Sequence, residues 1–98
     1  MIDYVEGRLE EKGEEGAVIS VGGLGLSLFI STPTLQDLSN IGEKVRLYSY
    51  LHVREDLLQL YGFRDRQERG LFLKLISVSG IGPKVALALL SAYDPETF

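Results

Sequence analysis

The chain has 98 residues, of which 45% are hydrophobic, and it carries a formal net charge of −4. This length and apolar content support one packed domain, or one small domain and part of another, while the acidic balance argues against nucleic-acid binding over the whole surface. The chain has no cysteine, one histidine, no apolar run of about 18 residues and no targeting peptide, which predicts a soluble cytoplasmic protein without disulfides, metal or cofactor.

Residues 1–63 are predicted to form five short strands. Alternating residues in "YVEGRLEEK" lead through a polar turn at residues 12–16 into "AVISV", and "GGLG" marks the turn before "LSLFI". The stretch "TPTLQDLSNIG" predicts a short helix with Pro33 in its first turn and Gly42 at its end. Two more strands, "KVRLYSYLHV" and "LLQLYGF", meet near residues 54–56. This order is typical of an OB-type barrel, with an SH3-like barrel as the alternative.

The hydrophobic period changes from that of a strand to that of a helix at Asp65. Phe72, Leu75 and Ile76 fall on one helical face. Asp65 is expected to cap this helix, and Glu68 stands three residues later, where the second acid of a capping box belongs.

The segment "KVALALLSAY" predicts a second helix, and Asp94 and Pro95 suit the cap and first residue of a third. Because only four residues follow Asp94, the chain is expected to be a fragment that ends just inside that helix. The predicted fold is therefore mixed, β then α: an OB-type barrel domain in residues 1–63, and a truncated helix-hairpin-helix domain in residues 64–98.

The two predicted helices are joined by "SGIGPK". Gly80 and Gly82 permit left-handed or otherwise restricted backbone angles and keep side chains off the surface, while Ile81 is expected to point inward and Pro83 to preset the next helical turn. The N–H groups of Gly80, Gly82 and Lys84 can then face a phosphate at the positive end of the helix dipole, and Lys84 adds a full charge. The alternative is an ordinary turn with a glycine cap. The pattern resembles the helix-hairpin-helix motif of DNA-binding proteins, which positions a protein on DNA without reading sequence.

Glu55 and Asp56 are expected at a hairpin tip between the last two strands. Paired carboxylates can bind Mg²⁺ or perform acid–base chemistry, but no third or fourth acidic ligand stands nearby in sequence. They can also be plain solvated turn residues. The interpretation that we favour is electrostatic: two negative charges at the tip repel the strands of a polyanion and exclude wrong placements.

The strand before this tip has two different faces. One face is expected to fill the barrel with Val45, Leu47, Leu51 and Val53. The other face is basic and aromatic: Arg46, Tyr48, Tyr50, His52 and Arg54. This second face can stack the bases of single-stranded nucleic acid, form a subunit interface, or be covered by the helices that follow. The single histidine, His52, is expected to pack or hydrogen-bond rather than to act as a ligand.

The charges are unevenly distributed along the chain. Acids crowd the first hairpin: Glu6, Glu10, Glu11, Glu14 and Glu15. Several bases lie in the second half: Arg46, Arg54, Arg64, Arg66, Arg69, Lys74 and Lys84. An anionic partner is therefore expected to meet the second half of the chain.

The combination of "VREDLLQLYGF" with "QERGLFLKLISVSGIGPKVALALLS" closely resembles the RuvA family of Holliday-junction-binding subunits, and "GRLEEK" and "VGGLGL" fit its N-terminal domain. The resemblance covers essentially all 98 residues. It implies a non-catalytic subunit, without an ATP site, that forms a four-fold homotetramer, holds an open four-way DNA junction and supports branch migration driven by the ATPase RuvB.

The family pattern can be carried over to individual residues. It implies that Glu55 and Asp56 form an acidic pin at the junction centre, and it matches the phosphate-gripping hairpin to Gly80, Ile81, Gly82 and Lys84. It also implies a second helix-hairpin-helix and a C-terminal domain that contacts RuvB, both absent from these 98 residues.

Two other functions remain as alternatives. A generic OB-type single-strand-binding protein would use Tyr48 and Tyr50, and a magnesium-dependent nuclease would use Glu55 and Asp56.

Overall fold

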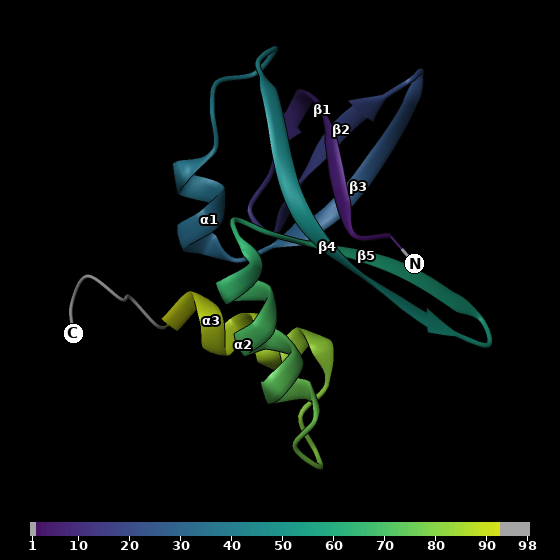
Figure 1. Ribbon diagram of the computed structural model, residues 1–98, viewed down its shortest axis with the longest axis vertical. Helices are drawn as coiled ribbons and strands as arrows, with labels where there is room; N and C mark the ends of the chain where they lie inside the picture. The colour runs from purple at the N-terminus through teal and green to yellow at the C-terminus, as the bar shows by residue number, and fades with distance from the viewer. Residues whose placement is uncertain (1, 93–98) are drawn as a thin grey trace.

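A barrel of five strands stands above a pair of helices in the computed structural model, which describes residues 2–92 (Figure 1). The elements in chain order are β1 (Tyr4–Lys12), β2 (Gly16–Val21), β3 (Leu24–Ile30), α1 (Thr32–Asp37), β4 (Lys44–Arg54), β5 (Leu57–Phe63), α2 (Arg66–Ile76) and α3 (Pro83–Ala92). The predicted third helix, at Asp94 and Pro95, lies outside the described residues. None of the helices in residues 2–92 is long and apolar enough to cross a membrane.

The strand order identifies the barrel as the OB type. The sheet closes in the order β1-β2-β3-β5-β4, with β4 pairing back onto β1. All pairs are antiparallel except β3 with β5, which run parallel from Leu28↔Leu60 to Ile30↔Gly62. A parallel pair cannot be joined by a tight turn, and here α1 and β4 intervene between the two strands. The predicted five strands, with one small helix between the third and the fourth, are confirmed.

The interior of the barrel is filled by alternate residues of every strand together with α1. The buried members of this cluster are Val5, Leu9, Ala17, Ile19, Leu28, Ile30, Leu35, Val45, Leu47 and Leu60. Gly62 also faces the interior, because a Cβ added there would lie 2.9 Å from Cδ2 of Leu28 and 3.2 Å from Cδ1 of Leu47. Glycine at this position therefore lets the barrel close around its aliphatic side chains.

Strand β4 fills the barrel only along its first part. Val45 and Leu47 are buried and Leu51 packs against the core, as predicted, but Val53 is 56% exposed. The prediction for Val53 was wrong because β4 and β5 continue as a two-stranded hairpin beyond the rim of the barrel (Figure 1). A side chain on the inner face of that extension has no opposite wall to pack against.

Helix α1 is shorter than predicted. Pro33 lies in its first turn, as expected, but the helix ends at Asp37, and Leu38 is already extended. Gly42 instead takes φ 93° in the turn before β4, where its N–H donates to the carbonyl of Leu9 at 2.7 Å. Gly42 therefore serves the turn that returns the chain to the barrel, not the end of the helix.

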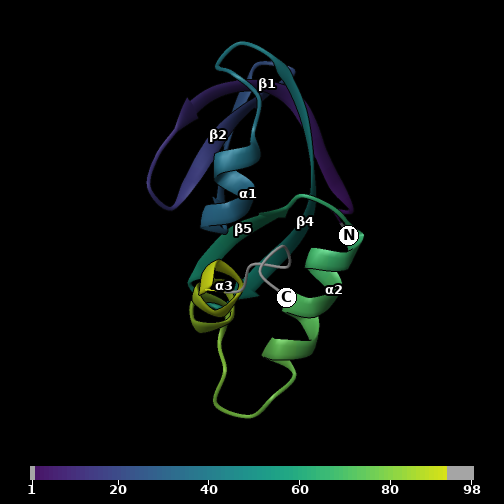
Figure 2. The ribbon, with the colours of Figure 1, turned by 90° about the vertical axis from the view of Figure 1, so that its left-hand side faces the viewer.

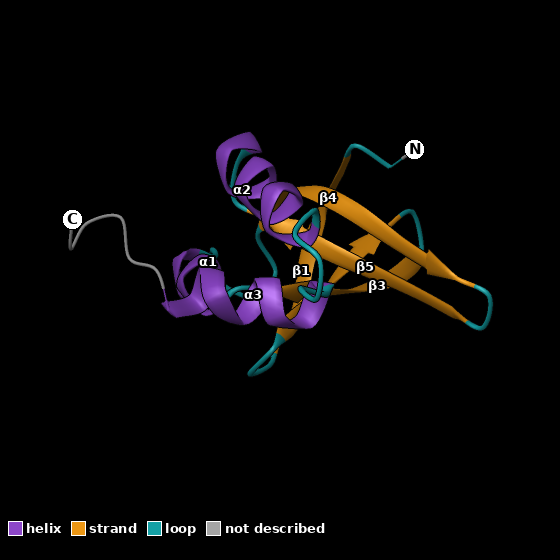
Figure 3. Cartoon of the chain, turned by 90° about the horizontal axis from the view of Figure 1, so that it is seen from below, coloured by secondary structure: helices purple, strands orange, loops and turns teal. Residues whose placement is uncertain are grey.

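A second cluster joins the barrel to the helices, which lie together below it (Figures 2 and 3). Tyr61 and Phe63 point outward from β5 and contact Phe72 of α2, with ring centroids 5.4 and 4.8 Å apart. The other buried members are Ala86, Leu87 and Leu90 of α3. Leu75 and Ile76 pack against the same cluster, which confirms the predicted apolar face of α2. Burial raises the pKa of Tyr61, whose hydroxyl donates to Oε1 of Gln59 at 3.1 Å.

The start of α2 is capped by Asp65 as predicted, but only one of the two hydrogen bonds of a capping box is found. The side chain of Asp65 accepts a hydrogen bond from the N–H of Glu68 at 2.8 Å. The reciprocal bond of a capping box is absent among the described contacts, because the Glu68 carboxylate accepts from the N–H of Arg64 and from side chains of the α1 segment instead.

Phe72→Ala is expected to lower the free energy of unfolding by about 3–5 kcal/mol, because the ring is fully buried against three other aromatic rings. Leu73→Ala is the matched control, since Leu73 is the next residue of the same helix and is 40% exposed. Urea unfolding followed by circular dichroism measures both. Equal, small losses for the two variants would contradict the assigned core.

Candidate nucleic-acid interface

The connection between α2 and α3 is a tight hairpin closed by its own backbone. Helix α2 ends at Ile76, and the N–H of Ile81 donates to the carbonyl of Val78 at 3.1 Å. Gly80 takes φ 89°, whereas Gly82 is not left-handed. Ile81 packs against the aromatic cluster, which confirms that it points inward. The predicted need for a left-handed glycine therefore holds at Gly80, and Gly82 serves another purpose.

Gly82 is the cap of α3, and its lack of a side chain leaves the helix start open. The N–H of Ala86 donates to the carbonyl of Gly82 at 3.0 Å, which is the first hydrogen bond of the helix. Within residues 2–92, the N–H groups of Gly80, Gly82 and Lys84 donate to no protein acceptor. A Cβ at Gly80 or Gly82 would meet nothing within 4 Å. An oxyanion can therefore approach these donors without obstruction.

The side chain of Lys84 packs against the barrel. Its Nζ lies 3.2 Å from the centroid of the Phe29 ring on β3. A cation over an aromatic face is held by the quadrupole of the ring. The charge of Lys84 therefore lies between α3 and the barrel. Sequence reasoning missed this contact, because nothing near Lys84 in sequence signals Phe29.

The tip of the β4–β5 hairpin carries Glu55 and Asp56. They form the two-residue turn between the paired residues Arg54 and Leu57, and both are exposed. In Figure 1, this tip and the α2–α3 hairpin project from the molecule at two separate places. Both places lie outside the part formed by β1, β2 and β3. In residues 2–92, no group of three His, Asp or Glu side chains is arranged to hold a metal ion. The tip thus presents two carboxylates as charges on a rigid arm.

The same hairpin has an apolar face that the barrel does not cover. Val53 and Leu58 pair across the two strands on this face and are 56% and 69% exposed, whereas Leu57 pairs with Arg54 on the opposite face and is 40% exposed. Exposed apolar groups gathered in this way are typical of contact surfaces.

The aromatic residues on the outer face of β4 contact α2. The Tyr50 ring lies 5.6 Å from Phe72, while Tyr48 lies beneath the guanidinium groups of Arg66 and Arg69, at 5.3 and 5.6 Å. Both tyrosines are half-buried. Of the three interpretations of this face, the structure therefore supports cover by the helices over base stacking.

Several bases of the second half are paired with acids of the first half. The closest ion pairs, each at 3.0 Å, are Arg46–Glu6, Arg64–Asp37 and Arg69–Asp3. The hydrogen bond from Arg46 lowers the pKa of Glu6, and the same bond raises the pKa of Arg46.

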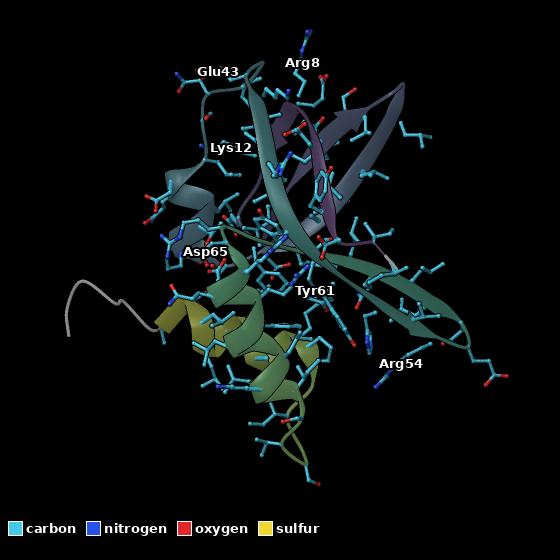
Figure 4. All side chains as sticks on the ribbon, in the orientation of Figure 1. Arg8, Lys12, Glu43, Arg54, Tyr61 and Asp65 are labelled. Carbon is cyan, nitrogen blue, oxygen red and sulfur yellow. The ribbon has the colours of Figure 1, made fainter. Side chains whose placement is uncertain are left out.

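Three of the predicted bases, Arg54, Lys74 and Lys84, take part in no ion pair within residues 2–92. Figure 4 shows the side chain of Arg54 extending from the β4–β5 hairpin. Folding therefore engages four of the seven bases in ion pairs within the chain.

Two family models match the chain. The model described as RuvA N terminal domain matches residues 1–62, and the model described as SAM-like Helix-hairpin-helix tandem matches residues 72–98. The first match covers the strands and α1, and the second begins at Phe72 of α2.

Curated proteins from several bacteria are similar over nearly the whole chain, and each is described as "Holliday junction branch migration complex subunit RuvA". The protein of Acetivibrio thermocellus is 44% identical over 98 residues, all of this chain and 48% of the relative. That of Prosthecochloris aestuarii is 47% identical over 96 residues, 98% of this chain and 48% of the relative. That of Brevibacillus brevis is 51% identical over 96 residues, 98% of this chain and 46% of the relative. The chain thus spans about half the length of these relatives.

Gly80→Ala is expected to lower the free energy of unfolding by about 1–2 kcal/mol, because a residue with a Cβ is strained at φ 89°. Gly82→Ser is the control in the same hairpin. It has open space and no left-handed angle, and serine is a good helix cap, so its stability should equal or exceed that of the unmodified chain. Thermal unfolding measures both, and a Gly80→Ala variant as stable as Gly82→Ser would refute the assigned backbone conformation.

Proposed function

The chain belongs to the RuvA family, and from this premise we propose that it supplies the junction-binding part of a non-catalytic subunit that recognises four-way DNA junctions and supports branch migration in recombination and repair. The observation that carries the proposal is a single fold with two exposed elements suited to DNA. One is a carboxylate tip on a projecting hairpin, and the other is a helix start with unobstructed N–H donors. The proposal includes a barrel domain in residues 1–63 and a DNA-binding helical domain in residues 64–98.

The α2–α3 hairpin is proposed to grip a duplex arm by its phosphates. The N–H groups of Gly80, Gly82 and Lys84 would donate to phosphate oxygens at the positive end of α3, while Ile81 anchors the loop in the aromatic cluster. The Lys84 ammonium, held on Phe29, would add positive charge behind this site. Contacts to the backbone carry no sequence information, so the grip would accept any duplex.

The tip is proposed to act as an acidic pin. Glu55 and Asp56 form the turn that joins β4 to β5, so the two strands carry their charges beyond the rim of the barrel. Near the crossing point of a junction they would repel the phosphates of strands on either side. Repulsion of this kind favours an open arrangement and excludes a continuous duplex from the centre.

The partners in this proposal are DNA, further copies of the chain and an ATPase. A homotetramer would bring four tips together, and the exposed apolar face formed by Val53 and Leu58 supports association between copies. The ATPase RuvB would supply the energy for moving DNA, through a part of the subunit outside these residues. The proposed place of action is the cytoplasm.

The test of the proposal is a competition gel-shift. A labelled immobile four-way junction is challenged with matched duplex and with single strands, with and without Mg²⁺, while light scattering gives the mass of the free protein. We expect junction preference without a metal requirement, in a tetramer. A preference for single strands would instead indicate a generic OB-type function, and cleavage that requires Mg²⁺ would indicate a nuclease.

Gly82→Val is expected to weaken binding to junction and duplex alike, by about tenfold or more, because the added side chain blocks charge-assisted hydrogen bonds to phosphate. Gly25→Val adds the same bulk on β3, where a Cβ meets only Val18 at 3.4 Å, and should leave binding unchanged. Fluorescence anisotropy with both DNAs gives the dissociation constants. Normal duplex affinity in a folded Gly82→Val protein would contradict the phosphate grip.

Glu55→Gln combined with Asp56→Asn is expected to keep or raise the affinity for DNA. Each charge a few Å from a phosphate opposes binding by about 1 kcal/mol in water, so removal of one charge can tighten binding about fivefold and removal of both up to about thirtyfold. Glu10→Gln with Glu11→Gln removes two exposed charges from β1 and is the matched control. The same anisotropy titrations apply, and a marked loss of affinity in the tip variant alone would count against the pin.

A further inference from the structure

Helix α2 is attached to the rest of the molecule by two polar contacts that lie on either side of the aromatic cluster. They come from neighbouring residues, Glu68 and Arg69, which point in directions about 100° apart on a helix. Neither residue belongs to the proposed DNA-contacting elements. The question is what these contacts add to a helix that is already held by buried rings.

Glu68 binds the segment that ends β3 and begins α1. Its carboxylate accepts from Oγ of Ser31 at 2.8 Å and from Oγ1 of Thr34 at 2.8 and 2.7 Å, one distance for each carboxylate oxygen. It also accepts from the N–H of Arg64 at 2.8 Å. Ser31 and Thr34 are 0% and 1% exposed. Two buried hydroxyl groups therefore depend on this one carboxylate as their acceptor.

Arg69 binds the opposite side, where the N-terminal segment meets β4. Its Nη1 donates to the carbonyl of Asp3 at 2.8 Å, to Oδ1 of Asp3 at 3.0 Å and to the carbonyl of Ser49 at 3.3 Å. The side chain of Arg69 is only 18% exposed. One guanidinium thus connects α2 both to the segment before β1 and to β4.

The buried aromatic contact and the polar contacts of α2 have different effects on the position of the helix. Burial of Phe72 against Tyr61 and Phe63 stabilises the contact, but the hydrophobic effect is non-directional and lets packed surfaces rock. Hydrogen bonds depend on angle, and those to charged groups are the strongest. Bonds on both sides of the cluster therefore define how α2 is rotated against the barrel.

That rotation determines where the α2–α3 hairpin lies relative to the β4–β5 tip. The tip is carried by the strands of the barrel, and the hairpin is carried by α2. A duplex arm needs only the hairpin, whereas a junction must meet hairpin and tip together. Binding elements that act together need to be held to within about 0.5 Å.

We propose that Glu68 and Arg69 are positioning residues that hold the hairpin at a fixed distance from the tip, and that they thereby determine the preference for a four-way junction over linear duplex. This inference rests on the proposed function of the two elements. If the distance varies, the tip charges miss the crossing point or repel the gripped arm, while duplex binding through the hairpin is unaffected.

The experiment uses the natural absence of cysteine. Spin labels are placed at Ser27→Cys on β3 and Ser79→Cys in the hairpin, both exposed positions, and labelled chain is diluted with unlabelled chain so that distances are measured within one copy. Pulsed electron resonance then gives the distance distribution in Glu68→Met, Arg69→Met and the control Gln67→Met, an exposed residue of the same helix turn. Anisotropy gives junction and duplex dissociation constants for the unlabelled versions.

We expect broader distributions in Glu68→Met and Arg69→Met and a fall of about tenfold in the ratio of junction to duplex affinity, the factor that corresponds to one charge-assisted hydrogen bond. Duplex affinity should stay within about twofold of the unmodified chain, and Gln67→Met should change nothing. Where Glu68→Met fails to fold, Thr34→Val removes one of the three donors to the same carboxylate with little change in the shape of the side chain, and Arg69→Lys replaces Arg69→Met.

Unchanged distance distributions would overturn the inference. So would a broadened distribution with an unchanged affinity ratio, or an equal loss on both DNAs, which would indicate a role in stability alone. A failure of the proposed function has a different signature: the unmodified chain, with a narrow distance distribution, would bind junction and duplex equally.

Discussion

The second part of strand β5, from Leu60 to Phe63, is buried on both of its faces, and the rest of the structure depends on this constraint. Its inner face supplies Leu60 and the space at Gly62 that close the barrel, while its outer face supplies Tyr61 and Phe63 as the surface on which the helices pack. The same strand begins at the β4–β5 tip. One strand therefore connects the barrel core, the carboxylate tip and the helical hairpin, so that the proposed pin and the proposed grip share one rigid element.

The charges of the chain are arranged by folding rather than by their order in sequence. Asp3, Glu6 and Asp37 form ion pairs with three arginines that follow later in the chain, which engages part of the basic charge within the fold. Of the charged side chains that remain exposed, the tip carboxylates and Arg54 lie together on the projecting hairpin. The proposed binding elements are backbone N–H donors and a few bases rather than a basic surface, which would let a chain of net charge −4 bind a polyanion locally.

The proposed phosphate site also shows how a barrel and a helical hairpin can share functional residues. Lys84 belongs to the hairpin in sequence, but its ammonium rests on Phe29 of the barrel. Glu68 and Arg69 belong to α2, but their partners are Ser31, Thr34, Asp3 and Ser49. The geometry between the two proposed DNA-contacting elements is therefore a property of their common interface, and neither element specifies it alone.

The sequence by itself determined the features that depend on neighbouring residues. The alternation of the strands, the change of period at Asp65, the cap made by Asp65 and the left-handed Gly80 were all predictable, because period, cap and turn chemistry are local. So was the place of Glu55 and Asp56 between two strands. Only the tertiary structure decided the exposure of Val53, the early end of α1, the cover over Tyr50 and the partners of Lys84, Glu68 and Arg69. Each of these depends on where the barrel rim lies or on contacts between residues from distant parts of the chain. A local sequence pattern encodes neither the position of the rim nor these contacts.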